Sequence, residues 1–351
     1  MPNLVVVEAG VSSIQGLGRY GSQRYGIAPG GAMDRMALAE GNALTGLPSG
    51  SAAIEIGPLP ARFAIVDGPV RIAITGAERD VLVDGIRVPL GVSQVVKDGQ
   101  AISFRGVRSG QYTYLSIQGG LHGRTSKPTK TSSTHPQAVN SWTFVDGDRV
   151  AVRAAIAGQL EQRLKLRRRS GVPIRVILGP QLEYFSTSAI SKFLSTDWML
   201  THAANRMACV LRGDRIDLHR GCDIVSDGTV TGNIQVAGSG QPIVILNDRG
   251  TIGGYPKIAT IISADLGWFA QMQLMGRVKF ESVSVIEAQT VARDFAFELA
   301  NLRPKLEAVQ PDGQISIAAL YDNNVAGDAF CPDDWLPDQP AVNDASLGKW
   351  S

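Results

Sequence analysis

Residues 240–257 read Gly240-Gln-Pro-Ile-Val-Ile-Leu-Asn-Asp-Arg-Gly-Thr-Ile-Gly-Gly-Tyr-Pro-Lys257, and an apolar β-branched run follows. The pattern predicts two strands, Pro242 to Leu246 and Lys257 to Ser263, with a glycine-rich loop between them. Glycine lets the backbone turn sharply and approach a ligand closely. This stretch therefore predicts a β-rich lobe whose loop can bind a small molecule.

Short strands of the same kind recur before this stretch. Val70 to Thr75, Asp80 to Asp84 and Gln111 to Ile117 alternate apolar with polar residues and end at turn-forming residues. Asp84-Gly85 predicts a hairpin turn, because both residue types tolerate positive φ. Since glycine (39) and proline (18) separate many such runs, we predict a mainly β protein with some α.

Four segments have the apolar spacing of a helix. In the first of them Asp34 stands in the first turn and Gly46 follows the end, as the helix dipole and a C-terminal cap favour. We predict helices at Ala32 to Leu44, Leu182 to Leu194, Leu266 to Met275 and Glu287 to Leu302, and a strand at Arg277 to Ile286.

The length of 351 residues suits two lobes of about 150 residues each. We expect a first β-barrel lobe with one helix at 1–160, a basic linker at 161–173, and a second β-barrel lobe with the Gly-Gly-Tyr loop at 174–286. A helix and a tail rich in proline and aspartate occupy 287–351. We interpret the basic cluster Arg163 to Arg169 as a solvated connection, with a patch for an acidic partner as the alternative.

The bulk composition excludes several function classes. A net charge of +2, with 19% charged residues, indicates no nucleic-acid partner. No apolar run reaches roughly 18 residues, so no membrane span is expected, and the N-terminus lacks the features of a signal peptide. The three cysteines and four histidines are scattered, which predicts no metal site. We therefore expect a soluble, cytoplasmic protein.

The glycine-rich loop gathers side chains that suit a small polar ligand. An amide, a carboxylate, a guanidinium, a hydroxyl and an ammonium occur within residues 247–257, and convergent groups of these kinds bind amides and carboxylates. A hairpin with surface charges is the alternative. The candidate residues are Asn233, Gln235, Asn247, Asp248, Arg249, Thr251, Gly253, Gly254, Tyr255 and Lys257.

Two further segments are candidates to bind an anion. The run Gln15-Gly-Leu-Gly-Arg19 is followed by Gly26-Ile-Ala-Pro-Gly-Gly-Ala-Met-Asp34, a glycine-rich approach to a helix start. Backbone N–H groups near Gly31 and the guanidinium of Arg19 suit a carboxylate or phosphate, against an alternative of tight turns alone. Arg206 is a candidate to bind an anionic substrate, with an ordinary surface arginine as the alternative.

These segments, with the strand Tyr112-Thr-Tyr-Leu-Ser-Ile-Gln-Gly-Gly-Leu121 and the run Gly179-Pro-Gln-Leu-Glu-Tyr-Phe185, resemble the KipA-like family, also called allophanate hydrolase subunit 2. That family includes the C component of bacterial 5-oxoprolinase and one half of the carboxyltransferase domain of urea amidolyase. The resemblance is most specific at Gly232 to Val236 and at Gly240 to Leu266, and it runs from about Val5 to Ser284.

The resemblance implies two cyclophilin-like β-barrel lobes and a KipI-like partner subunit. The family acts on small amides, through carboxylation of urea with carboxybiotin or through ATP-dependent opening of 5-oxoproline. This chain has neither a P-loop nor a Met-Lys-Met biotinylation site, so we expect no covalently bound cofactor, with ATP or carboxybiotin used by the complex. A LamB-like subunit, or a biotin carboxylase and its carrier protein, would complete the assembly.

We hypothesise a role for each catalytic candidate. Asp248 would orient the substrate N–H or act as the base, Arg249 and Lys257 would orient a carboxylate, and Tyr255 would close the site. The N–H groups of Gly253-Gly254 would stabilise an oxyanion.

The alternative from another class is a KipA-like regulatory protein that binds a KipI-like kinase inhibitor without catalysis. Two polar residues of the family pattern are replaced here by Gly16 and Gly30, which favours this alternative.

Overall fold

The computed structural model describes residues 1–124, 141–167 and 172–309. Residues 1–308 form one compact unit. The proline- and aspartate-rich tail expected near the C-terminus lies outside the described residues, as does part of the basic cluster.

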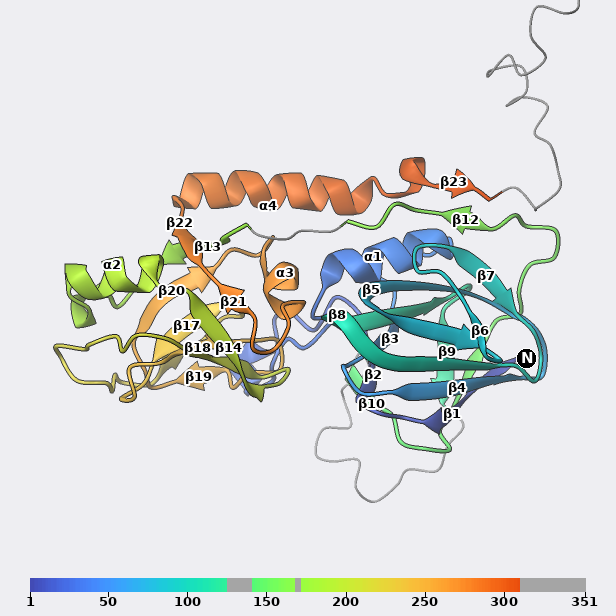
Figure 1. The fold of residues 1–351 in the computed structure, drawn as a ribbon, viewed down its shortest axis with the longest axis horizontal. Coiled ribbons are helices and arrows are strands. Elements are labelled where there is room, and N and C mark those ends of the chain that lie inside the picture. The colour runs from blue at the N-terminus through green and yellow to red at the C-terminus, as the bar shows by residue number, and fades with distance from the viewer. Residues whose placement is uncertain (125–140, 168–171, 310–351) are drawn as a thin grey trace, which may run out of the picture. The chain divides into compact units, whose positions relative to one another are not determined.

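The first lobe is built on an antiparallel sheet of eleven strands within the described residues (Figure 1). Its main path runs β10-β2-β3-β8-β4-β1-β11-β9, while β5 pairs with β6, β7 and β8. The strands are β1 (Asn3–Glu8), β2 (Ser12–Gln15), β3 (Ala53–Ile56), β4 (Ala61–Val66), β5 (Val70–Val83), β6 (Ile86–Arg87), β7 (Ser93–Val96), β8 (Ala101–Ile117), β9 (Leu121–Arg124), β10 (Ser141–Thr143) and β11 (Arg149–Val152).

The second lobe is built on a sheet of eight strands within the described residues. The order is β21-β14-β15-β18-β17-β20-β13-β22, and only the β13–β22 pair is parallel. The strands are β13 (Ile174–Leu178), β14 (Trp198–Ala204), β15 (Ala208–Arg212), β17 (Asn233–Val236), β18 (Pro242–Ile245), β20 (Lys257–Ile261), β21 (Arg277–Val278) and β22 (Phe280–Ser282).

The two sheets confirm the predicted fold class, which is mainly β with a half-barrel and a nearly closed barrel. Each sheet encloses its own apolar core. The predicted strands at 70–75 and 80–84 are one long bulged strand, β5. Asp84 and Gly85 both have positive φ, at 46° and 86°, and turn β5 into β6 as predicted.

Helices cover the sheets at a few places. They are α1 (Arg35–Leu44), α2 (Thr187–Ser195), α3 (Leu266–Ala270) and α4 (Val285–Ala300), with short 3₁₀ turns η1 (Gln23–Tyr25), η2 (Leu182–Tyr184) and η3 (Arg303–Lys305).

All four predicted helices exist, but their bounds differ. α1 begins only at Arg35, because the Asp34 carboxylate caps it by accepting the N–H groups of Met36 and Ala37. In the same way α2 begins after its N-cap, Ser186. The predicted helix at 266–275 ends at 270.

The predicted strand from Arg277 to Ile286 is wrong in its second half. β22 ends at Ser282, and Ser284 then starts α4 through a capping box with Glu287. This Ser-x-x-Glu pairing satisfies backbone N–H groups at both of its ends, which favours helix over strand at that point.

The connection at residues 162–167 is only partly solvated: Arg163, Lys165 and Arg167 are exposed, but the residues between them pack on the protein. β12 (Gln162–Arg163) pairs with β23 (Glu307–Ala308). Leu164 is buried in an apolar cluster with Met36 and Leu302. Leu166 and Arg167 line a cavity that is described below. The segment therefore packs on the body of the protein.

Residues 29–33 of the first lobe bind to both lobes. The N–H of Arg19 donates to the carbonyl of Pro29, and the N–H of Ala32 donates to that of Gly16. Met33 extends into the core of the second lobe, where it is buried among apolar side chains from the second sheet and α2. We call residues 29–33 the seam segment.

The seam segment depends on glycine at position 31. Gly31 has φ of +88°, and a β-carbon there would stand 2.7 Å from the backbone nitrogen of Gly18. Gly21 has nearly the same φ, +89°, but has nothing within 4 Å of that position. A comparison of Gly31 with Gly21 therefore separates the cost of the left-handed backbone from the cost of steric overlap.

We predict that Gly31→Ala destabilises the protein more than Gly21→Ala does. The left-handed backbone alone costs about 1–2 kcal/mol for alanine, and only position 31 adds a clash with backbone atoms. Urea unfolding of both variants measures the difference. Equal losses of free energy of unfolding would contradict the tight packing at Gly31.

No helix among the described residues is both long enough and apolar enough to cross a lipid bilayer.

Candidate active site

Arg206, in the turn between β14 and β15, forms a charge network that joins the lobes. Its Nε and Nη2 donate to the two carboxylate oxygens of Asp248, at 2.7 and 2.9 Å. Its Nη1 donates to Oε1 of Glu55 in β3 of the first lobe. Nη2 also donates to the carbonyl of Gly31, at 2.8 Å. Such charge-assisted, bidentate bonds are among the strongest polar contacts in proteins.

The network is largely buried. The side chain of Arg206 is 16% exposed and that of Glu55 is 2% exposed, while Asp248 is 34% exposed. Burial alone would lower the pKa of Arg206, but Glu55 and Asp248 outweigh it and hold this pKa above the ordinary arginine value. One permanently charged guanidinium therefore serves two carboxylates, one from each lobe.

The second oxygen of Glu55 fixes the seam segment to the first sheet. It accepts the N–H of Met33 at 2.8 Å and the hydroxyl of Tyr114 at 2.7 Å. The Tyr114 hydroxyl in turn accepts the N–H of Asp34 at 2.7 Å. Burial raises the pKa of Tyr114, so its hydroxyl stays protonated and keeps donating to Glu55.

Asn247 holds the seam segment from the side of the second lobe. Its side-chain amide donates to the carbonyls of Gly31 and Ala32, at 3.2 and 2.9 Å, and its own carbonyl accepts the N–H of Gly30 at 3.1 Å. A β-carbon at Gly30 would stand 3.6 Å from Nη2 of Arg19 and 3.7 Å from Oδ1 of Asp248. Arg19, Gly31, Arg206, Asn247 and Asp248 are thus brought together.

The other charged candidates of the loop, Arg249 and Lys257, form hydrogen bonds outside the Arg206 network. Arg249 is buried and donates to Oγ1 of Thr231 and to the carbonyl of Thr229, both at 3.1 Å. Lys257 is also buried, and its Nζ donates to Asp227 at 2.8 Å. The partners of Arg249 lie in the segment before β17, and the partner of Lys257 lies in β16 (Asp227–Gly228). The two cations are therefore held by different backbone segments.

The loop residues between them make mainly structural contacts. Gly253 lies in β19 (Ile252–Gly253), which pairs with β16. A β-carbon there would stand 2.4 Å from the side-chain nitrogen of Gln235, which donates to the carbonyl of Tyr255 at 3.5 Å. Gly254 accepts the N–H of Ile224 through its carbonyl. The side chain of Tyr255 is partly exposed.

Asn233 and Thr251 stabilise the base of the loop. The Asn233 side chain accepts the N–H of Val230 and donates to Thr260, at 2.7 and 2.9 Å. The Thr251 carbonyl accepts the N–H of Thr229. These bonds connect β17 with β20, and the loop with the segment before β17.

Three cavities within the described residues adjoin α3, and two of them are also lined by residues of the seam segment. The smallest, about 80 Å³, is lined by Gly30, Ala32 and Asn247, among others. A mostly apolar groove of about 440 Å³ is lined by Met33, Tyr112, Arg206 and Phe269, among others. Residues 248–257 line neither of them.

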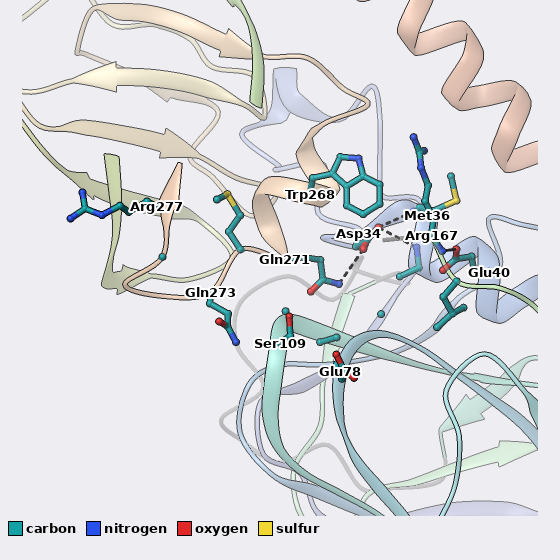
Figure 2. Close-up of a pocket in the computed structure, with 17 residues that line it drawn as sticks. Asp34, Met36, Glu40, Glu78, Ser109, Arg167, Trp268, Gln271, Gln273 and Arg277 are labelled. Atoms are coloured by element: carbon teal, nitrogen blue, oxygen red, sulfur yellow. Dashed lines mark hydrogen bonds between the residues drawn. The ribbon is translucent and has the colours of Figure 1, made fainter. Parts of the chain in front are cut away.

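Figure 2 shows the third cavity, in which Asp34, the N-cap of α1, and Glu40 of α1 lie near Arg167, Trp268 and Gln271. Its volume is about 530 Å³. Gln271 donates to Asp34 at 3.1 Å, and the N–H of Arg167 donates to Glu40 at 2.7 Å. The Arg167 guanidinium lies over the Trp268 ring, 5.1 Å from its centroid. The cavity therefore combines two buried carboxyls with a cation and an aromatic face.

Both carboxyls are protonated more easily than usual. Burial raises the pKa of Glu40 from 4.5 to about 8, against the opposing effect of the bond from Arg167. Burial also raises the pKa of Asp34 despite its hydrogen bonds to Ala37 and Gln271. A carboxyl that titrates near neutral pH can act as a general acid or base.

Glu55 and Glu40 were not among the candidates predicted from sequence. The sequence does contain one indication of each, a single acid inside an apolar strand or helix. Such an acid is rarely buried without a partner or a role. Glu55 stands in Ala53-Ile-Glu-Ile56, and Glu40 follows Met36-Ala-Leu-Ala39.

No group of three or more histidine, cysteine, aspartate or glutamate side chains among the described residues is arranged to hold a metal ion.

A protein-family model for the carboxyltransferase domain, subdomain A and B, matches residues 25–282 of the chain. The chain belongs to this carboxyltransferase family. The family thus confirms the resemblance seen in the sequence, and its matched region contains the seam segment, Arg206 and the glycine-rich loop.

Two relatives cover most of this carboxyltransferase-family chain. It is 32% identical to the C component of 5-oxoprolinase from Haemophilus influenzae, over 83% of this chain and 94% of that protein. It is 31% identical to the C component of 5-oxoprolinase from Escherichia coli, with the same coverage. The relationship therefore extends over almost the whole of both relatives.

The fold is similar to that of urea amidolyase from K. lactis, with a TM-score of 0.75 at 21% identity. The match covers 89% of this chain and 22% of the urea amidolyase chain. At this identity the likeness supports the fold of the carboxyltransferase family.

We predict that Arg206→Met destabilises the protein by about 3–5 kcal/mol, because it leaves two carboxylates without their counter-charge. Arg206→Lys, which keeps the charge but cannot bond both carboxylates in the same way, should lose less. Chemical denaturation measures both. A loss below about 1 kcal/mol for Arg206→Met would show that the network does not hold the lobes together.

We predict that Glu40→Gln makes stability less dependent on pH. Between pH 4.5 and about 8 the unfolded protein releases the Glu40 proton while the folded protein retains it, so the wild type loses stability as pH rises. Glutamine removes this loss, and the variant should gain melting temperature over wild type at pH 8 relative to pH 5. A constant difference in melting temperature across that range would contradict a buried, protonated Glu40.

Proposed function

We propose that this chain is one component of a multi-subunit, cytoplasmic enzyme that acts on a small amide, with a 5-oxoproline-like lactam as the favoured substrate. The observation that carries the proposal is the coverage of the two 5-oxoprolinase relatives. Each is matched over 94% of its length, whereas urea amidolyase is matched over a small part of its chain.

The proposed site is the space beside the seam segment. Opening or carboxylation of an amide needs hydrogen-bond donors for the carbonyl oxygen and an acceptor for the N–H group. Asp248 is the acceptor with access to solvent, and Arg206 fixes the plane of its carboxylate. Gly30 places no side chain between Asp248 and Arg19. A small planar ligand would fit against these groups.

Activation of the amide is proposed to come from partners. The sequence contains no P-loop and no biotinylation motif, so ATP or carboxybiotin would be handled by the complex. We propose a KipI-like subunit as the direct partner, with a LamB-like subunit, or a biotin carboxylase and carrier protein, completing the assembly.

The second candidate is a regulatory protein that binds a KipI-like inhibitor and catalyses nothing. The burial of Arg249 and Lys257 in structural bonds favours this candidate, because it removes two of the predicted catalytic cations from free access to a ligand.

We predict that Asp248→Ala lowers turnover of the assembled complex by more than about 100-fold, the usual scale for a positioned acid–base group. The chain is co-expressed with the neighbouring subunits, and ATP-dependent product is measured from 5-oxoproline, urea and other small amides. Asp248→Asn tests whether charge or hydrogen bonding is needed.

Asp217→Ala serves as the control, since this aspartate is mostly exposed and distant in sequence from the seam segment. Its turnover should equal that of wild type. A complex that assembles but converts none of the amides would refute the enzyme and support the regulatory candidate.

A further inference from the structure

The cavity of Figure 2 is separate from the site proposed beside the seam segment. Its wall is formed by α1 with its N-cap, by β5 and β8, by α3 with the chain that follows it, and by residues 166 and 167. Arg206, Asn247 and Asp248 do not line it. Its volume of about 530 Å³ lies within the range of roughly 300–1,000 Å³ that is usual for small-molecule sites. The cavity therefore has room for a whole small ligand.

Glu40 presents an unbonded oxygen to this cavity. The residue is only 3% exposed, and its Oε1 accepts the N–H of Arg167 at 2.7 Å. Within the described residues its Oε2 accepts no hydrogen bond, and Glu40 forms no ion pair. Oε2 is not enclosed by protein atoms either, so it reaches the space of the cavity that Glu40 lines. A carboxyl oxygen in so buried a residue normally has a partner, and its absence calls for an explanation.

The buried charged groups of the cavity wall are acids. Asp34 is 7% exposed, and its oxygens already accept hydrogen bonds from the backbone of α1 and from Gln271. Two arginines also line the cavity, but both are exposed to solvent. Of these, Arg167 is paired with Glu298 of α4 at 2.7 Å. The interior of the cavity thus has an excess of acidic groups.

The surroundings of Glu40 lack a cation that would hold it ionised. Burial is the main cause that raises its pKa to about 8, and the charges of Asp34 and Glu298 raise it further, while the backbone N–H and the charge of Arg167 act in the opposite direction. The other charged side chains of the wall are Glu78 of β5 and Arg277 of β21, and neither β8 nor α3 contributes one. A positive charge on a ligand would supply the missing counter-ion.

We propose that this cavity binds a small aliphatic ligand through its protonated primary amine, which donates to Oε2 of Glu40. Met36, Leu166 and Met272 line the same cavity and give the aliphatic part of the ligand an apolar wall. An ammonium and a carboxylate attract each other more strongly in such a partly dry space than in bulk water. The ammonium keeps its proton, and Glu40 gives its own proton to the solvent when the pair forms.

Isothermal titration of the full-length chain with n-pentylamine tests the site, with 1-pentanol as the uncharged ligand of the same length. At pH 7 pentylamine is protonated, as a lysine side chain is, and Glu40 is mostly protonated as well. Binding should therefore release about one proton per bound amine, measured by repeating the titration in buffers of different ionisation enthalpy.

The affinity for pentylamine should also rise by about 10-fold per pH unit from pH 6 to pH 7, because only ionised Glu40 binds the ammonium. 1-Pentanol should bind at least about 10-fold more weakly than pentylamine at pH 7, the effect of one lost charged hydrogen bond. Its affinity should not change with pH.

Glu40→Gln should weaken pentylamine binding by about 10-fold or more and abolish the proton release, while 1-pentanol binding stays the same. Glutamine keeps an acceptor for the N–H of Arg167, so the variant is expected to fold. Glu281→Gln removes an exposed carboxylate of β22 and serves as the matched control, with binding equal to that of wild type.

Proton release on pentylamine binding that disappears in Glu40→Gln would support the site. No binding of pentylamine, equal affinities for pentylamine and 1-pentanol, or an affinity that is independent of pH would overturn it. The last three results are measured on the wild-type chain, so they decide the question even where Glu40→Gln fails to fold. Since no turnover is measured, the result is independent of the proposed function.

Discussion

The ion pairs of Arg206 are the constraint on which the rest of the structure depends. This guanidinium, from the second sheet, is shared between Glu55 of the first lobe and Asp248 of the second. Glu55 in turn holds Met33 and Tyr114, so the charge network and the insertion of Met33 into the second core fix the same segment. Two β lobes with separate cores therefore behave as one compact unit.

The cavities next to the fixed segment are the basis for the proposed function. Residues 29–33 are held by backbone and side-chain bonds from both lobes, and this keeps the backbone that lines the 80 Å³ cavity in place. One of the cavities beside α3 carries two carboxyls, Asp34 and Glu40, whose pKa values are raised by burial. Proteins place such costly groups where chemistry or binding requires them. These features are the reason that we propose the seam as the binding place of a small polar substrate.

The sequence predicted the fold class and the existence of the glycine-rich loop, because both depend on local patterns of β-branched residues and turns. It did not predict where the loop's side chains point. The sequence predicted that Arg249 and Lys257 are available to bind a ligand. In the structure they bind Thr231 and Asp227, which lie in an earlier segment of the chain. Glu55 and Arg206 are 151 residues apart, and no local pattern reveals that they meet. The strand predicted at 277–286 is wrong after Ser282, because the capping box of Ser284 and Glu287 starts α4 there.

The central claim is that the space beside residues 29–33 receives the substrate. The most direct measurement is a crystal structure of the chain in its assembled complex with a bound 5-oxoproline-like lactam. The account predicts electron density of the ligand between Gly30, Asn247 and Asp248. Ligand density at a place remote from the seam segment would contradict it.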